Sequence, residues 1–221
     1  MDTVARFYEC GYYAWDYFPL TVSHLPCMTT FCAADRIEYL IASQQDELLA
    51  ARRLVQTCYG RRGYDTPHAD TQPGESTLLA RIGNQVIGTV TVRCASRVRL
   101  QAEAGFAEHV SELLRQGRRL VEYTRFAIDR AWAGRHDVAA ELIRRALLLG
   151  RMALGATDCL IEVNPRHMRY YQRQFGFTVR GPERTCERVG APARLLHLDL
   201  EDMPHCVAHE PAGALRPGIT C

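Results

Sequence analysis

The sequence predicts an α/β sandwich built around one central mixed sheet. Short apolar runs rich in β-branched residues, typical of strands, alternate with longer segments whose apolar residues recur every three to four positions, as in amphipathic helices. The resulting order is β-α-β-β-α-β-α-β-α-β, which is the pattern of a layered α/β domain. With 221 residues, the chain is long enough for one such domain with a sizeable core.

The first half of the chain predicts three strands and two helices. Turn residues bound the two strands of a hairpin, and a Ser followed three residues later by Asp favours a helix start. In chain order we expect a strand over Arg36–Ala42, a helix over Gln44–Tyr59 capped by Ser43, a hairpin of Leu78–Ile82 with Val86–Val92, and a helix over Glu103–Gln116.

The second half of the chain predicts three further strands and two helices. Its first helix has a strong apolar stripe and ends at a glycine, which is a common helix stop. In chain order we expect a strand over Val121–Ile128, a helix over Val138–Leu154 closed by Gly155, a strand over Cys159–Val163, a helix over Arg166–Phe175, and a strand over Ala193–Leu200.

The last of these helices has clear start and stop signals. Asn164 is a good N-cap and Pro165 suits the first helical position, while Gly176 suits a left-handed helix stop. Helical spacing places Tyr171 on the inner stripe and Tyr170 toward the rim. Tyr171 is therefore either a core tyrosine or one whose hydroxyl faces a reaction centre.

Composition excludes several classes of function. The formal net charge is only +2, which argues against a nucleic-acid-binding surface. All 27 basic residues are arginines, so Schiff-base chemistry and a phosphate-loop lysine are excluded. No apolar stretch approaches the length of a membrane span, and a cytoplasmic location with reduced cysteines is expected.

Three regions are expected along the chain. Residues 1–35 read as an N-terminal arm or leader, 36–202 as the folded domain, and 203–221 as a flexible tail. The tail carries His205, Cys206, His209 and Cys221, but without a paired-cysteine motif no metal site is expected there.

Five segments together resemble bacterial long-chain N-acyl amino acid synthases of the GNAT acyltransferase superfamily. In order they are "RLVQTCYGRRGY", "VIGTVTV", "VEYTRFAID", "VNPRHMRYYQRQFGF" and "APARLLHLDL", spread over residues 36–200. The third is also similar to the E-x-S-R-F stretch of acyl-homoserine lactone synthases. The resemblance implies a GNAT-like fold whose central mixed sheet is mostly antiparallel, with helices on both faces.

The resemblance also implies a reaction. A long-chain fatty acyl group, held as a thioester on acyl carrier protein, would pass to the amine of an amino acid. The amine must lose a proton, the thioester carbonyl must be polarised, and the thiolate must leave. No metal or other cofactor is required for these steps.

Glu122 is the candidate for receiving the proton of the amine. On a central strand between Val121 and Phe126, partial desolvation would raise the pKa of its carboxyl. Thr124 lies on the same face by period two and is a candidate for substrate contact together with Phe126. The alternative for Glu122 is a structural ion pair with Arg125 or another arginine.

Arginines are the candidates for binding the carboxylate of the amino acid. Arg125 points away from Glu122 on a straight strand and reaches the same side only if a bulge reorients the strand. If so, its guanidinium can bind a carboxylate; otherwise it is a structural arginine. Arg53 is a second candidate, unless it lies on a solvated helix face.

The start of the final helix supplies further candidates. Relatives suggest that Tyr171 protonates the departing thiolate, although core packing explains it equally well. Asn164 and His167 are candidates for contact with the substrate or the pantetheine arm, and a lone surface histidine is the alternative for His167. The oxyanion would be stabilised by a backbone N–H of Val121–Ile128.

The donor-binding loop departs from CoA-dependent relatives. Their R/Q-x-x-G-x-G/A turn holds a pyrophosphate, whereas Asp129–Asp137 has one glycine at the wrong spacing. This favours acyl carrier protein as the donor. Arg144, Arg145 and Arg151 then either form its docking face or lie on the solvated side of their helix. The alternatives are a homoserine-lactone-type signal synthase, a CoA-dependent acetyltransferase and a non-catalytic acyl-binding module.

Overall fold

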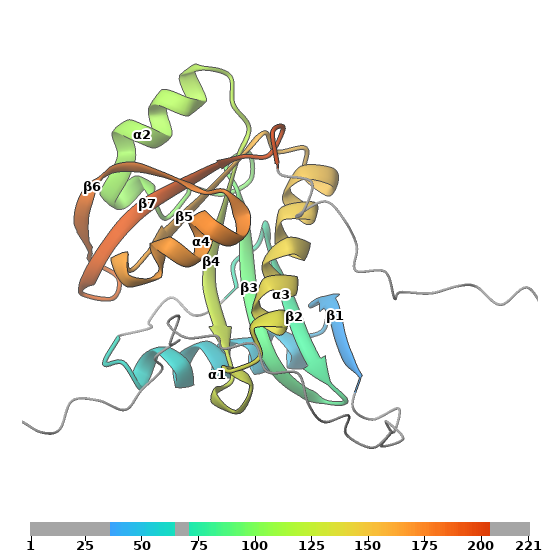
Figure 1. The fold of residues 1–221 in the computed structure, drawn as a ribbon. Helices are drawn as coiled ribbons and strands as arrows, with labels where there is room; N and C mark the ends of the chain where they lie inside the picture. Colours follow the sequence, from blue (N-terminus) through green and yellow to red (C-terminus); the bar gives the residue numbers. More distant parts are fainter. Residues whose placement is uncertain (1–35, 65–70, 204–221) are drawn as a thin grey trace, which may run out of the picture.

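The computed structural model describes residues 36–64 and 71–203, which form one seven-stranded α/β structure (Figure 1). The predictions of an arm over residues 1–35 and of a tail without a metal site fall outside the described residues. Among the residues described, no helix is long and apolar enough to cross a membrane.

The sheet is mixed and mostly antiparallel, as predicted. Its strand order is β1-β2-β3-β4-β5-β7-β6, and only the pair β4–β5 is parallel. The strands are β1 Ile37–Ile41, β2 Glu75–Ile82, β3 Gln85–Cys94, β4 Leu120–Ile128, β5 Asp158–Val163, β6 Thr178–Cys186 and β7 Ala191–Asp199.

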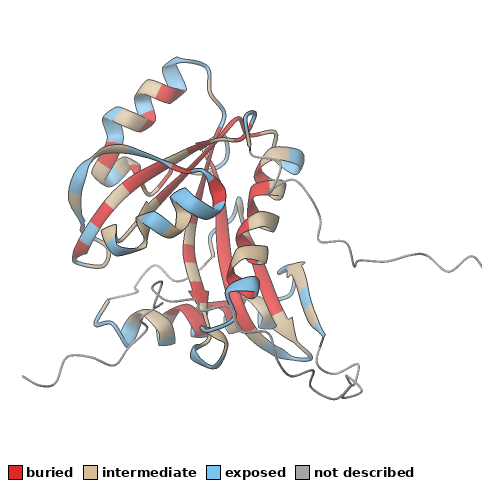
Figure 2. Ribbon diagram, viewed as in Figure 1, coloured by how far each residue is buried: buried red, intermediate tan, exposed pale blue. Residues whose placement is uncertain are grey.

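Helices cover both faces of the sheet (Figure 2). On one face, α3 (His136–Leu148) and α4 (Met168–Phe175) pack on apolar residues of β3, β4 and β5. On the other face, α2 (Glu103–Arg115) covers the Leu120 and Leu160 side chains, and α1 (Gln45–Gly60) covers Ala127.

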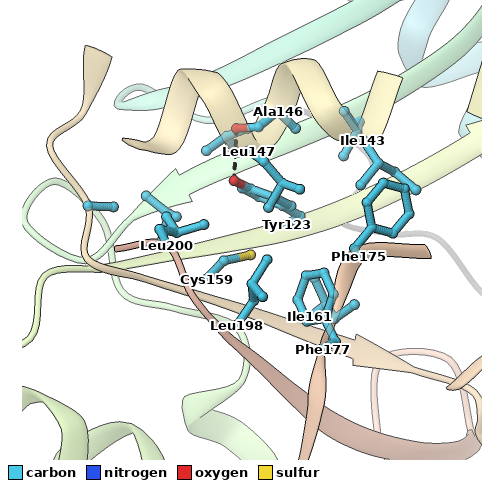
Figure 3. Close-up of a cluster of buried hydrophobic side chains, with 14 of the residues drawn as sticks. Tyr123, Ile143, Ala146, Leu147, Cys159, Ile161, Phe175, Phe177, Leu198 and Leu200 are labelled. Atoms are coloured by element: carbon cyan, nitrogen blue, oxygen red, sulfur yellow. Dashed lines mark hydrogen bonds between the residues drawn. The ribbon is translucent and has the colours of Figure 1, made fainter. Parts of the chain in front are cut away.

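A buried tyrosine joins the sheet to α3. The hydroxyl of Tyr123 on β4 donates a 2.8 Å hydrogen bond to the carbonyl of Ala146 (Figure 3). The following turn, Leu149–Ala153, is a π-helix. Gly150 leaves room for this contact, because a Cβ there would lie 2.8 Å from the Tyr123 hydroxyl oxygen.

One strand was missed by the sequence prediction. β6 pairs with β7 at the edge of the sheet and gives seven strands instead of six. Its residues are mostly exposed or half-buried, and Gly181 and Pro182 interrupt it at a shift of register, so no apolar alternation marks it.

Several predicted boundaries of helices and strands needed correction. Gln44, rather than Ser43, is the N-cap of α1, and the Glu47 carboxylate accepts from the N–H groups of both residues. The helix predicted over Val138–Leu154 begins at His136 and leaves α-geometry at Leu148. The helix predicted from Arg166 consists of a 3₁₀ turn, Pro165–His167, followed by α4. The strand predicted to end at Leu200 spans Ala191–Asp199.

Candidate active site

The two central strands β4 and β5 separate halfway along their length. They pair only from Leu120 with Asp158 to Tyr123 with Ile161. Beyond this point β4 continues toward α1, while β5 diverges beside β7 toward α4 (Figure 1). We call this separation the fork. One backbone edge of β4 beyond Tyr123 has no strand partner among the described residues, so its N–H groups are available to an oxyanion.

A β-bulge lies in β4 at the fork. Thr124 pairs with Thr91 and Ala127 with Thr89, so Arg125 and Phe126 together face the single residue Val90. Arg125 has a φ of 52° and is the one non-glycine residue with positive φ in the described chain. The bulge brings the Arg125 side chain to the same side as Glu122, which is the arrangement that the sequence left open.

Six charged side chains form a largely buried belt across the face of the sheet that carries Glu122. Glu75 forms ion pairs with both Arg93 and Arg125, and the Nε of Arg93 lies 3.9 Å from Glu122. Nη2 of Arg188 lies 3.1 Å from Oε1 of Glu162. The charged belt comprises Glu75, Arg93, Glu122, Arg125, Glu162 and Arg188, and its charges sum to zero when all three glutamates are ionised.

Glu122 is fully buried within this belt. Its oxygens accept hydrogen bonds from the backbone N–H groups of Gln101, at 2.5 Å, and Ala102, at 2.9 Å, which lie just before α2. The predicted desolvation of Glu122 is confirmed, and its carboxylate anchors the start of α2. Burial and the charge of Glu162 raise the pKa of Glu122 to about 7. Its contact with an amine stays a prediction.

The predicted neighbours on β4 lie at the fork. Thr124 is half-buried, and its hydroxyl oxygen is buried without a hydrogen-bond partner in the described chain. Phe126 is half-buried and packs on the side of α3. Its carbonyl accepts a 3.4 Å hydrogen bond from the hydroxyl of Tyr59 in α1. Burial raises the pKa of Tyr59 to about 12, against the opposing charges of Arg62, Arg125 and Arg188.

The other side of the fork carries the residues predicted at the final helix. Asn164 caps the 3₁₀ turn, accepting from the N–H of Arg166 at 3.3 Å. Nε2 of His167 accepts from Nε of Arg166 at 3.2 Å. Burial, together with Arg166 and Arg62, lowers the pKa of His167 to about 4, so the ring is neutral at pH 7.

The two tyrosines of α4 are not divided into one inner and one outer residue. Tyr170 and Tyr171 are both half-buried, and both rings pack against Phe175. The hydroxyl of Tyr170, which was expected at the rim, is buried. Tyr171 also packs edge-on against Phe177, with ring centroids 5.9 Å apart. The acid role of Tyr171 stays a prediction.

Arg53 lies apart from these residues. It is exposed on α1 and forms no ion pair with a described residue, as expected for a solvated helix face. The structure thus brings Glu122, Thr124 and Arg125 together on one side of β4 and places Phe126 on the other side, toward α3. Asn164, His167 and Tyr171 lie across the fork, and Arg53 lies outside it.

Four members of the charged belt were not identified from the sequence. Glu75, Arg93, Glu162 and Arg188 come from separate strands and a turn, so no local motif contains them. One signal was present: Thr89, Thr91 and Arg93 alternate with valines, which indicates a polar second face on a central strand.

Comparisons with known proteins agree with this geometry. A sequence model of the N-acyl amino acid synthase FeeM family matches residues 50–199. The structure of FeeM, an N-acyl amino acid synthase from uncultured soil microbes, is similar with a TM-score of 0.68 and 26% identity, covering 76% of this chain and 92% of that chain. No curated protein sequence matches the chain.

Two further structures share the fold at lower identity. The acyl-homoserine lactone synthase LasI is similar with a TM-score of 0.53 and 18% identity, covering 75% of this chain and 91% of that chain. An acyl-CoA N-acyltransferase from Pseudomonas aeruginosa has a TM-score of 0.56 and 15% identity, covering 73% and 99%. The predicted GNAT-like fold is confirmed.

Proposed function

The chain belongs to the N-acyl amino acid synthase FeeM family of acyltransferases, and from this premise we propose that it moves a long-chain fatty acyl group from acyl carrier protein to the amine of an amino acid. The main support for the proposal is that this member of the family has a fork. At the fork β4 contains a bulge and β5 separates from β4. An extended thioester donor inserted there would meet the unpaired backbone edge of β4.

The loop after β4 supports a carrier-protein donor over CoA. Its own carboxylates occupy the positions that would attract a pyrophosphate. Oδ1 of Asp129 accepts from the N–H of Ala131 at 2.9 Å, and Asp137 lies in the first turn of α3, paired with Arg135 at 2.7 Å. A helix N-terminus that already holds a carboxylate repels a second anion.

The arginines beside the fork support docking of an acidic carrier protein there. The arginines expected to dock the carrier protein are engaged: Arg144 and Arg145 on α3 pair with Glu141, and Nη1 of Arg151 in the following turn lies 3.9 Å from Glu201. By contrast, five exposed arginines near the fork form no ion pair with any described acidic residue. We call these the basic rim: Arg61, Arg62, Arg166, Arg169 and Arg173.

The chemistry assigns a task to each group at the fork. A backbone N–H on the free edge of β4 stabilises the oxyanion, and the guanidinium of Arg125 binds the carboxylate of the amino acid. Tyr171 returns a proton to the departing thiolate. Thr124, Phe126, Asn164 and His167 line the path of the substrates, and no metal or redox group takes part.

A product assay tests the proposal. The full chain is incubated with palmitoyl carrier protein and a mixture of amino acids, and the products are identified by mass spectrometry. We expect an N-acyl amino acid that is absent without enzyme. Turnover with acetyl-CoA alone would instead indicate a CoA-dependent acetyltransferase, and tight acyl binding without turnover would indicate a binding module.

A further inference from the structure

Two buried polar atoms at the fork make no hydrogen bond within the described chain. They are the hydroxyl oxygen of Thr124 and Oε1 of Glu162. Glu162 has a side chain that is only 8% exposed, and it forms an ion pair with Arg188, whose Nη2 lies 3.1 Å from Oε1 outside ideal hydrogen-bonding geometry. A buried carboxylate oxygen whose neighbouring donor is poorly aligned can still accept hydrogen bonds, so this position suits a ligand that brings donors.

The sheet register places both atoms on one face. Glu122 lies opposite Leu160 in the parallel ladder, so two residues further on, Thr124 and Glu162 leave their strands on the same side. Each follows the last paired residue of its strand by one position. They are the first side chains on this face after the two strands separate.

An ammonium group can supply hydrogen-bond donors to these two oxygen atoms. It carries a positive charge and three donors, which matches an ionised carboxylate and a hydroxyl acceptor. An amino acid is a zwitterion and leaves the balanced charge of the belt unchanged, while its carboxylate can turn toward the nearby guanidinium of Arg125.

We infer that Thr124 and Glu162 form the subsite for the amino group of the acceptor, and that Glu162 takes the proton that this group must lose. The inference rests on the proposed function. It replaces the role first expected of Glu122, whose oxygens are already bound to the start of α2. Glu122 is then a positioning residue, which holds α2 and lies within reach of the charge of Glu162.

The proton balance of the reaction is closed. The ammonium gives one proton to the Glu162 carboxylate, and the free amine attacks the thioester carbonyl. Tyr171 gives a proton to the thiolate as the C–S bond breaks and regains one from the nitrogen of the tetrahedral intermediate, while Glu162 releases its proton to solvent. One amide and one thiol form, and one net proton leaves to solvent.

The test compares Glu162→Gln with Glu187→Gln, which changes an exposed glutamate in the turn next to Arg188. The amino acid that gives most product with the unaltered chain serves as acceptor, with palmitoyl carrier protein as donor. We expect Glu162→Gln to lower kcat/KM at pH 7 by about 100-fold or more. The loss should shrink at higher pH, where solvent deprotonates the amine, and Glu162→Asp should recover part of the activity.

Hydroxylamine separates loss of the base from loss of the fold. This amine is unprotonated at pH 7, so Glu162→Gln should still form the hydroxamate from the acyl donor. If Glu162→Gln had the same kcat/KM and the same pH profile as Glu187→Gln, the inference would be overturned while the proposed function stayed intact. If the unaltered chain forms no N-acyl product, the proposed function is wrong and the inference falls with it.

Thr124→Val gives an independent measurement that leaves the charged belt unchanged. Loss of the hydroxyl should raise KM for the amino acid by about tenfold, since one hydrogen bond to a charged group is lost. Hydroxamate formation should change little. An unchanged KM for the amino acid would contradict the subsite even if Glu162→Gln failed to fold.

Discussion

Glu122 shows how a single buried carboxyl can make stability depend on pH. Its pKa is raised to about 7, because burial and Glu162 outweigh the backbone donor of Gln101 and the charges of Arg188 and Arg93. Between pH 4.5 and 7 the folded chain therefore holds a proton that the unfolded chain releases. The stabilisation is complete below pH 4.5 and is lost as pH rises to 7.

We predict that Glu122→Gln removes this pH dependence. In the unaltered chain the contribution of Glu122 should fall by about 3 kcal/mol between pH 4.5 and 7.5, whereas the amide does not titrate. The measurement is the free energy of unfolding in urea at several pH values. His167 acts in the opposite direction, because its pKa is lowered and the unfolded chain takes up the proton, so His167→Gln is measured in parallel.

The difference in the free energy of unfolding between the unaltered chain and each variant, taken at each pH, gives the separate contributions of Glu122 and His167. Glu187→Gln serves as the control, since this glutamate lies in an exposed turn. Curves for the unaltered chain and Glu122→Gln that stay parallel from pH 4.5 to 7.5 would contradict the prediction.

At the scale of single residues, the sequence was informative where the cause is local. Asn164, Pro165 and Gly176 were predicted as cap, first turn and left-handed stop, and the structure confirms each. The surroundings of Glu122 could not be predicted, because the groups that hold it, Gln101 and Ala102, precede it by about twenty positions and belong to no recognisable motif.

At the scale of elements, amphipathic segments were predicted well and irregular ones were not. Periodicity found the four helices and six strands with a buried face. It missed β6, an edge strand without alternation, and the π-turn after α3. The π-turn lies beside a tertiary contact, in which the hydroxyl of Tyr123 donates a hydrogen bond to the carbonyl of Ala146.

We predict that Gly150→Ala destabilises the fold through this contact. The added Cβ would lie 2.8 Å from the hydroxyl oxygen of Tyr123 and 3.1 Å from Val121 Cγ2, so β4 and α3 must move apart. We expect a loss of about 1–3 kcal/mol in the free energy of unfolding, measured in urea. Gly134→Ala is the matched control, because a Cβ there meets nothing within 4 Å.

A second substitution identifies the cause. Tyr123→Phe removes the hydroxyl and should cost about 1 kcal/mol alone, but it also makes room for the methyl group. The double variant should therefore be more stable than the sum of the two losses implies. Strict additivity would show that the hydroxyl does not create the clash.

At the scale of the whole molecule, the sheet with helices on both faces followed from the sequence, and the charged belt did not. The belt joins β2, β3, β4, β5 and the turn after β6, so its members meet only once the strand order is fixed. The bulge that turns Arg125 toward it is likewise set by pairing with β3. The sequence pattern did not determine the order of the strands or the register in which distant strands pair.

The distribution of charge over the molecule yields the last prediction, which concerns the carrier protein. Arg166 and Arg169 of the basic rim are exposed near the fork without an acidic partner among the described residues, whereas Arg144 and Arg145 on α3 pair with Glu141. Guanidinium groups that have no carboxylate partner are available to an acidic protein, whereas the charge of those paired with a carboxylate is largely neutralised.

We therefore expect Arg166→Glu with Arg169→Glu to raise KM for palmitoyl carrier protein by at least about tenfold, and added salt to weaken the unaltered enzyme in the same way. KM for a short acyl-pantetheine thioester should not change, since that donor lacks the acidic protein. Arg97→Glu with Arg115→Glu makes the same change of charge at exposed positions elsewhere and serves as control. A larger effect of Arg144→Glu with Arg145→Glu would move the docking surface to α3, because only the face that contacts the carrier protein responds to reversal of its charge.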